Sequence, residues 1–138
     1  MRDIKFRGKT YEGKWMYGYY YYGHRNDEHI IVTNFQELDD FIEVIPETVG
    51  QYTGLMDKNG DKIYEGDIIY YKNTMHDSQL DGAYSKVEYR LGEYVLRFSN
   101  NKRLSMTRFE QRILVDGASE LTVKGNIHDN PGLLKKTD

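Results

Sequence analysis

Three carboxylates close together in the chain are the residues whose types first suggest acid–base chemistry. Asp61, Glu65 and Asp67 lie just before the apolar run 68–71 at the centre of the sequence. Glycoside hydrolysis needs two carboxyl groups roughly 5–10 Å apart across a cleft, one of them with a pKa raised by burial. All three residues are expected at turns, where water keeps a carboxyl group ionised at neutral pH. We therefore predict no catalytic residue here and no enzymatic activity.

Asp57, Asn59 and Asp61 have the alternating spacing of a calcium-binding loop. An EF-hand that begins at Asp57 would need glycine at its sixth position and glutamate at its twelfth, where this chain has lysine and isoleucine. The same residues are explained by a β-hairpin turn over 57–60, which ends in Asn-Gly, a pair that accepts φ > 0. The turn is the favoured interpretation.

Histidine and cysteine provide no better metal site. The four histidines form no His-x-His or i,i+4 pair and have no cysteine beside them, since the chain has none; they are His24, His29, His76 and His128. Without cysteine, disulfides and a thiolate nucleophile are excluded. We predict that the chain binds no metal and no cofactor.

An aromatic stretch from Trp15 to Tyr22 is the first candidate interaction surface. Alternation in a strand places one set of side chains on one face: Trp15, Tyr17, Tyr19 and Tyr21. Tyr20 and Tyr22 lie on the other face with Gly18, which suggests a bulge or a close backbone approach. Exposed rings could stack nucleic-acid bases. Interface cores also favour Tyr and Trp, so we expect a symmetric subunit contact and a homo-oligomer.

A basic stretch near the C-terminus is the second candidate. Its cations are Arg97, Lys102, Arg103, Arg108 and Arg112, with Glu110 as the one acid among them. Such a stretch could contact nucleic acid or an acidic partner, or it could be a solvated face or a complement to the acidic centre of the chain. Residues 44–83 carry seven acidic and three basic side chains. The net charge of −3 makes nucleic acid the less favoured partner.

Short strands separated by turns are expected to position these residues. Apolar–polar alternation and β-branched or aromatic runs predict strands at 4–7, 14–22, 29–33, 41–45, 68–71, 84–91, 93–99 and 121–123. A capping-box spacing predicts one short helix over 107–114. Residues 73–83 are predicted to be a mobile loop.

These elements predict a mainly β fold, α+β at most. We expect a single domain of 138 residues, with an N-terminal β-meander over about 1–45 and a small, strongly bent, SH3-like β-barrel over about 46–138. No apolar run approaches the ~20 residues of a membrane span. The N-terminus also lacks the apolar region of a signal peptide, so we expect a cytoplasmic protein with no membrane partner.

Five segments in order carry a family resemblance: FRGK at 6–9, GKWMYGY at 13–19, VGQYTGLMDKNG at 49–60, IYEGDII at 63–69 and GNIHDNP at 125–131. Together they resemble the YopX family of phage and prophage proteins from low-GC Gram-positive bacteria. Residues 73–120 match that pattern only loosely.

The resemblance implies a phage or prophage origin, expression in a bacterial cytoplasm, a β-rich fold and a homo-oligomer. It implies no catalytic residue and no cofactor. Our functional hypothesis is thus a non-enzymatic phage accessory protein that assembles with itself and binds a host or phage macromolecule, such as an unidentified protein. The alternative is a nucleic-acid-binding β-barrel.

Overall fold

A computed structural model describes residues 5–33, 41–73, 82–106 and 119–135. The chain forms two compact units, Met1–Gly54 and Leu55–Asp138. The boundary lies later in the chain than the expected position near residue 45. Each unit is described by itself below.

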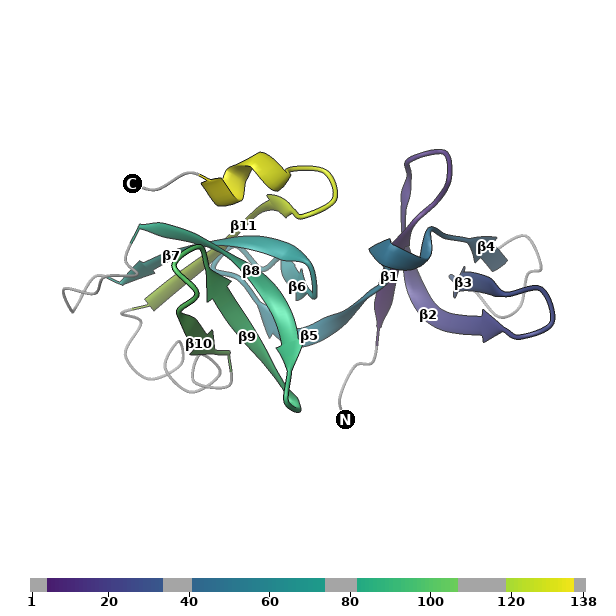
Figure 1. The fold of residues 1–138 in the computed structure, drawn as a ribbon, viewed down its shortest axis with the longest axis horizontal. Helices are drawn as coiled ribbons and strands as arrows, with labels where there is room; N and C mark the ends of the chain where they lie inside the picture. The colour runs from purple at the N-terminus through teal and green to yellow at the C-terminus, as the bar shows by residue number, and fades with distance from the viewer. Residues whose placement is uncertain (1–4, 34–40, 74–81, 107–118, 136–138) are drawn as a thin grey trace. The chain divides into compact units, whose positions relative to one another are not determined.

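The first unit is an antiparallel meander, as the sequence predicts. Its strands are β1 (Phe6–Lys9), β2 (Trp15–Gly23), β3 (Glu28–Val32), β4 (Phe41–Glu43) and the beginning of β5 (Gly50–Met56). Their order in the sheet is β4-β3-β2-β1-β5, so the first four strands are neighbours in chain order. A short 3-10 helix, η2 (Pro46–Thr48), precedes β5 (Figure 1).

Gly18 is required in the middle of β2 because another backbone lies against it. A Cβ built on Gly18 would collide with the carbonyl oxygen of Val32 and would lie 3.1 Å from the Cα of Thr33. The expected close backbone approach is therefore confirmed, and the approaching strand end is that of β3. Among the described residues of this unit, Ile31, Val32 and Val44 are the most buried aliphatic side chains, at 0–1% exposed.

The second unit contains a five-stranded antiparallel sheet. Its elements are β6 (Lys62–Tyr64), β7 (Asp67–Asn73), β8 (Ala83–Arg90), β9 (Glu93–Phe98), β10 (Arg103–Ser105), β11 (Ser119–Asn126) and the 3-10 helix η3 (Pro131–Lys135). The sheet order is β10-β9-β8-β7-β11, and the strands curl strongly in Figure 1. Ile63, Ile69, Leu96 and Leu121 form the centre of its core.

The turn between β5 and β6 is built by residues 57–61. The Asp57 amide donates to the Asp61 carbonyl at 2.8 Å, and the Gly60 amide donates to the Asp57 carbonyl at 3.1 Å. Gly60 has a φ of +85°, whereas Asn59 is not among the residues with positive φ. The predicted turn is thus confirmed, but glycine alone adopts the left-handed conformation that we expected of the Asn-Gly pair.

The mainly β fold class is confirmed, with two antiparallel sheets. Within the described ranges the helical elements are the short 3-10 helices η2 and η3. The helix predicted over 107–114 lies outside the described residues, as does most of the loop predicted over 73–83. No helix in the described part of the chain is long and apolar enough to cross a membrane.

Candidate functional site

The three carboxylates proposed for acid–base chemistry occupy different environments. Asp61 is exposed and Glu65 is half-buried, whereas Asp67 is 2% exposed. Our expectation that water solvates Asp67 is therefore wrong. Its carboxylate accepts a hydrogen bond from the Tyr64 amide at 2.8 Å. Because Tyr64 and Asp67 flank the β6–β7 turn, this bond closes the turn, which explains why a carboxylate is buried at this point.

The oxygens of Asp57 are also occupied by the backbone. Oδ1 accepts from the amides of Asn59 and Asp61, each at 2.9 Å. Oδ2 accepts from the amide of Val123 in β11 at 3.0 Å. Asp57 is 6% exposed, so its carboxylate organises the turn rather than facing a cation. Where the structure describes the chain, no three His, Cys, Asp or Glu residues gather as metal ligands.

The C-terminal GNIHDNP segment is likewise held by its own hydrogen bonds. Oδ1 of Asn126 accepts from the amides of His128 and Asp129 at 3.0 and 2.9 Å. The Asn126 side-chain amide donates to Asp129 at 3.2 Å. Asn126 is 9% exposed. These hydrogen bonds close a turn before η3 within the segment itself. The GNIHDNP segment therefore has a structural role.

Two histidines lie in an aromatic cluster on one face of the β2–β3 hairpin. The Tyr20 hydroxyl is hydrogen-bonded to Nδ1 of His29, and the rings of Tyr22 and His24 meet edge-on at 4.6 Å. Burial and the charge of Asp27 raise the pKa of Tyr20. A hydrogen bond to Asp27, then burial, raises the pKa of Tyr22. Both raised pKa values favour the neutral phenol.

The opposite face of β2 exposes tyrosines. Tyr17, Tyr19 and Tyr21 are 47%, 53% and 56% exposed. Tyr20, between them in sequence, is half-buried and packs against Phe6 with ring centroids 5.6 Å apart. The alternation predicted from the sequence is thus observed, and the structure decides which face is outside.

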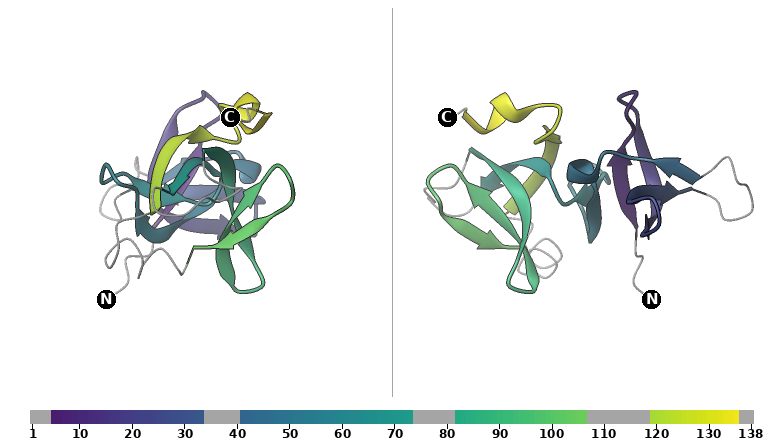
Figure 2. Two further views of the ribbon diagram at one scale, coloured as in Figure 1. Left: turned by 90° about the vertical axis from the view of Figure 1, so that its left-hand side faces the viewer. Right: turned by 45° about the vertical axis from the view of Figure 1, so that its right-hand side comes forward.

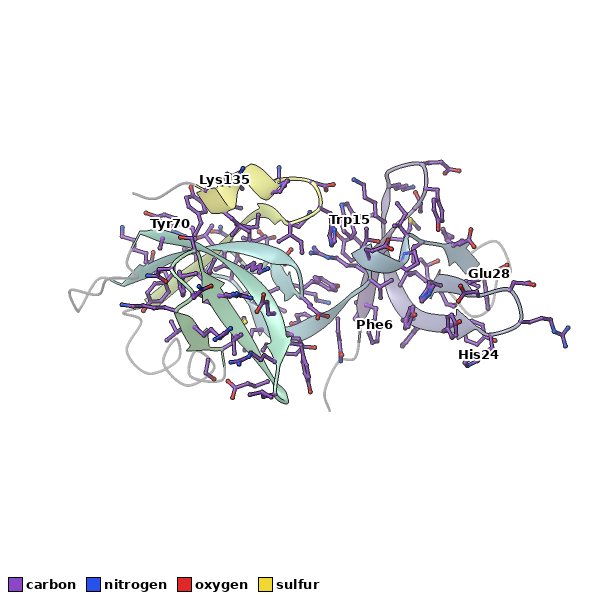
Figure 3. The ribbon with its side chains drawn as sticks, viewed as in Figure 1. Phe6, Trp15, His24, Glu28, Tyr70 and Lys135 are labelled. Carbon is purple, nitrogen blue, oxygen red and sulfur yellow. The ribbon has the colours of Figure 1, made fainter. Side chains whose placement is uncertain are left out.

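Trp15 differs from the three tyrosines. It is half-buried, and the Arg7 guanidinium lies 4.7 Å from the centre of its ring, a cation–π contact. Arg7 is 6% exposed and is the cross-strand partner of Tyr17. The Trp15 ring therefore covers a buried cation at the N-terminal end of β2. His24 directly follows the C-terminal end of the same strand (Figure 3).

Cross-strand register adds residues that the sequence could not assign to this surface. Tyr19 is opposite Val32, and Val32 is opposite Phe41. Opposite residues share a face of the sheet, and Phe41 is 41% exposed. We call Tyr17, Tyr19, Tyr21 and Phe41 the tyrosine face. Sequence analysis missed Phe41 because strand alternation says nothing about which strands are neighbours.

The predicted basic stretch is only partly assembled. Arg97 is opposite Arg103 on β10 and opposite Lys86 on β8, which the sequence analysis had not included. We call Lys86, Arg97 and Arg103 the basic row. Lys102 is exposed beside it. Arg108 and Arg112 lie outside the described residues.

One carboxylate offsets part of this positive charge. Glu88 lies 3.1 Å from Lys86 and 3.4 Å from Arg97. Burial opposes ionisation of Glu88, but the hydrogen bonds and charges of Lys86 and Arg97 outweigh it and lower the pKa of the carboxyl. Arg103 is the most exposed cation of the row. The basic row therefore presents less charge than its three cations imply.

Comparisons with known proteins identify the family to which this chain belongs. The chain is similar to the crystal structure of protein EF1440 from Enterococcus faecalis, at 28% identity and a TM-score of 0.63, covering 97% of this chain and 99% of that one. No curated protein matches it. The family model described as YopX protein matches residues 5–135, and this chain belongs to the YopX family.

Proposed function

We propose that this chain is a non-enzymatic phage or prophage accessory protein of the bacterial cytoplasm. It assembles with itself through the tyrosine face and binds a host or phage macromolecule. The observation that carries the proposal is the exposure of Tyr17, Tyr19 and Tyr21, each about half, on one face of one strand. The phage setting rests on the family resemblance.

The area of the tyrosine face supports an interaction site. Each aromatic side chain can bury about 150–250 Å². With about half of each ring exposed, the four residues of the tyrosine face together present roughly 300–500 Å² of aromatic surface. The largest apolar patch on a typical monomer is of similar size and is often functional. A standard interface buries about 800 Å² per partner, so the tyrosine face would form its centre.

A second copy of the chain is the occupant that best fits this surface. Tyr is amphipathic and can remain at the rim of a subunit contact with its hydroxyl in water. In a symmetric dimer the same face of a second copy would pack against it. Two described carboxylates share this face: Glu43 is in register with Ile30 and Tyr21, and Glu28 is opposite Gly23 at the end of β2.

The test is the mass of the protein in solution, measured by light scattering behind a sizing column. We expect wild type to exceed 16.3 kDa, the mass of one chain, and Tyr19→Glu to fall to that mass with an unchanged circular dichroism spectrum. Tyr11, 65% exposed in the β1–β2 turn, provides the matched control, because Tyr11→Glu should leave the mass unchanged. A wild-type mass of one chain at micromolar concentration would rule out self-assembly.

The basic row favours a second candidate function, weak binding of a polyanion such as nucleic acid. Three cations in register across β8, β9 and β10 form a strip that phosphates could contact. Glu88 within the strip and the chain's net charge of −3 weigh against tight binding. We therefore rank this function second.

A further inference from the structure

The β5–β6 turn contains a chemically reactive pair of residues. Asn59 and Gly60 form the only Asn-Gly pair in the sequence, and both residues are exposed. Asparagine is among the residues that degrade in water without an enzyme. Glycine has no Cβ to crowd its main-chain nitrogen, and a Cβ built on Gly60 would meet nothing within 4 Å. The pair therefore places a side-chain amide next to an uncrowded main-chain nitrogen.

These two groups can react with each other and then with water. The Gly60 nitrogen loses its proton and attacks Cγ of Asn59, so that an N–Cγ bond forms, the Cγ–Nδ2 bond breaks and ammonia leaves. The product is a five-membered succinimide. Water then opens the ring at one of its two carbonyl carbons. Opening at the side-chain carbonyl gives aspartate, and opening at the main-chain carbonyl gives isoaspartate, in which the main chain passes through Cβ and Cγ.

The hydrogen bonds of the turn oppose the first step. The Gly60 amide donates to the Asp57 carbonyl at 3.1 Å, so the attacking nitrogen is held away from its target with its proton in use. Oδ1 of Asp57 also accepts from the amides of Asn59 and Asp61, each at 2.9 Å. The attack therefore requires local opening of the turn, and the Asp57 carboxylate keeps the opened turn rare.

We propose that Asn59 is a site of spontaneous modification, converted to aspartate and isoaspartate through a succinimide, and that the Asp57 carboxylate limits the rate by holding the turn closed. Water is the second reactant, and no enzyme or cofactor is needed. This chemistry is independent of the proposed self-assembly, because it depends on one turn of the second unit.

Isoaspartate at position 59 would also disturb β11. It adds a carbon atom to the main chain of a turn that binds this strand through two hydrogen bonds. The Lys58 amide donates to the Leu121 carbonyl at 3.0 Å, and Oδ2 of Asp57 accepts from the Val123 amide at 3.0 Å. On its other side β11 pairs with β7, and it is drawn in yellow-green in Figure 2. Modification of the turn should therefore loosen the edge of the sheet.

The reaction is tested by ageing the full chain in warm, mildly alkaline buffer. Peptide mass spectrometry measures the exchange of the Asn59 amide for an acid, and labelling by an isoaspartyl methyltransferase measures isoaspartate. Asn101 and Asn126 are internal controls, because the side chains of Lys102 and Ile127 crowd the attacking nitrogen. We expect both products at Asn59, formed at least about tenfold faster than at either control. Conversion of Asn59 no faster than that of Asn101 would overturn the proposal.

The role of Asp57 is tested by the rate in variants. Asp57→Ala should accelerate conversion of Asn59 at least about tenfold, because three backbone amides lose a charged acceptor and the turn opens more often. Asp57→Asn retains one acceptor oxygen and should be intermediate, and it serves in place of Asp57→Ala where that variant does not fold. Asp61→Ala, in the same turn, should stay within about twofold of wild type. Rates equal to wild type in both Asp57 variants would overturn the role of this carboxylate.

The consequence for β11 is tested by hydrogen exchange of the aged protein. Ion-exchange chromatography separates the modified chain, which has gained a carboxylate, from the unmodified chain. The Val123 amide should exchange faster in the isoaspartate form than in the fresh protein, whereas the amide of Leu96 in β9 should not change. Equal exchange at Val123 in the two forms would overturn the effect on β11.

Discussion

At the scale of single residues, two glycines and one leucine show how backbone conformation and space act separately. Gly18 is required by space, because a Cβ there would collide with the Val32 carbonyl. Gly60 is required by conformation, because its φ is +85° and a Cβ there would meet nothing within 4 Å. Leu91 differs from both glycines, because it carries a side chain at a positive φ of +51° and that side chain is exposed.

The conformational role of Gly60 gives the first of these predictions. Gly60→Val should lower the free energy of unfolding by about 1–3 kcal/mol, because a β-branched residue is strained at φ > 0. Gly60→Asn is the control, since asparagine accepts this conformation and the space is open. Both are measured by urea unfolding. Equal midpoints for Gly60→Val and wild type would contradict the turn assignment.

At the scale of elements, the β5–β6 turn is stabilised by a strand that is distant in the chain. The Lys58 amide donates to the Leu121 carbonyl at 3.0 Å, next to the Asp57 bond to Val123. The register of β11 against β7 shifts between Val123 and Gly125, so Asp57 binds β11 beside its irregularity. The β5–β6 turn therefore also holds β11, an edge strand of the five-stranded sheet, in place.

Removal of the Asp57 carboxylate should therefore destabilise more than one local turn. Asp57→Ala should lower the free energy of unfolding by about 2–4 kcal/mol, because three backbone amides lose a charged acceptor. Asp57→Asn retains one acceptor oxygen and should be intermediate. Asp61→Ala removes an exposed carboxylate of the same turn and should change stability by less than about 0.5 kcal/mol. Similar losses for Asp57→Ala and Asp61→Ala would refute the link to β11.

At the scale of the whole molecule, the two units carry different candidate surfaces. The first unit has the tyrosine face, and the second has the basic row. The net charge of −3 applies to the whole chain, so any polyanion must approach a protein of the same sign. The salt dependence of nucleic-acid binding distinguishes attraction to the basic row from this overall repulsion.

We expect only weak binding of nucleic acid by the basic row. Three cations, two of them paired with Glu88, can release few counterions, so log affinity should fall against log salt with a slope no steeper than about −3. Anisotropy of a labelled oligonucleotide measures this. Arg103→Glu should abolish the low-salt binding, and Lys124→Glu, an exposed control, should reduce it less. Tight binding at about 150 mM salt that is lost in Arg103→Glu would make nucleic-acid binding the favoured function instead of self-assembly.

The sequence by itself determined eight of the strands, the 57–60 turn and the two aromatic faces of β2, whereas β5, β6 and β10 were not predicted. These features depend on contacts within a few residues, such as alternation in a strand and the tolerance of glycine for φ > 0. The family followed from the same local motifs. Tertiary structure decided which face of β2 is exposed, because Tyr20 packs on Phe6 whereas Tyr19 does not lie on that side of the sheet.

The pairing of strands that are distant in the chain decided the composition of the basic row and the burial of Asp67. Lys86 joins Arg97 and Arg103 only because β8, β9 and β10 are neighbours. Asp67 is buried although it lies at a turn, because the turn is enclosed by other elements: the Gly66 carbonyl accepts from Ile127, and the Gly66 amide donates to Val87. Local propensity cannot encode such pairings, since they depend on which apolar surfaces the whole chain buries together.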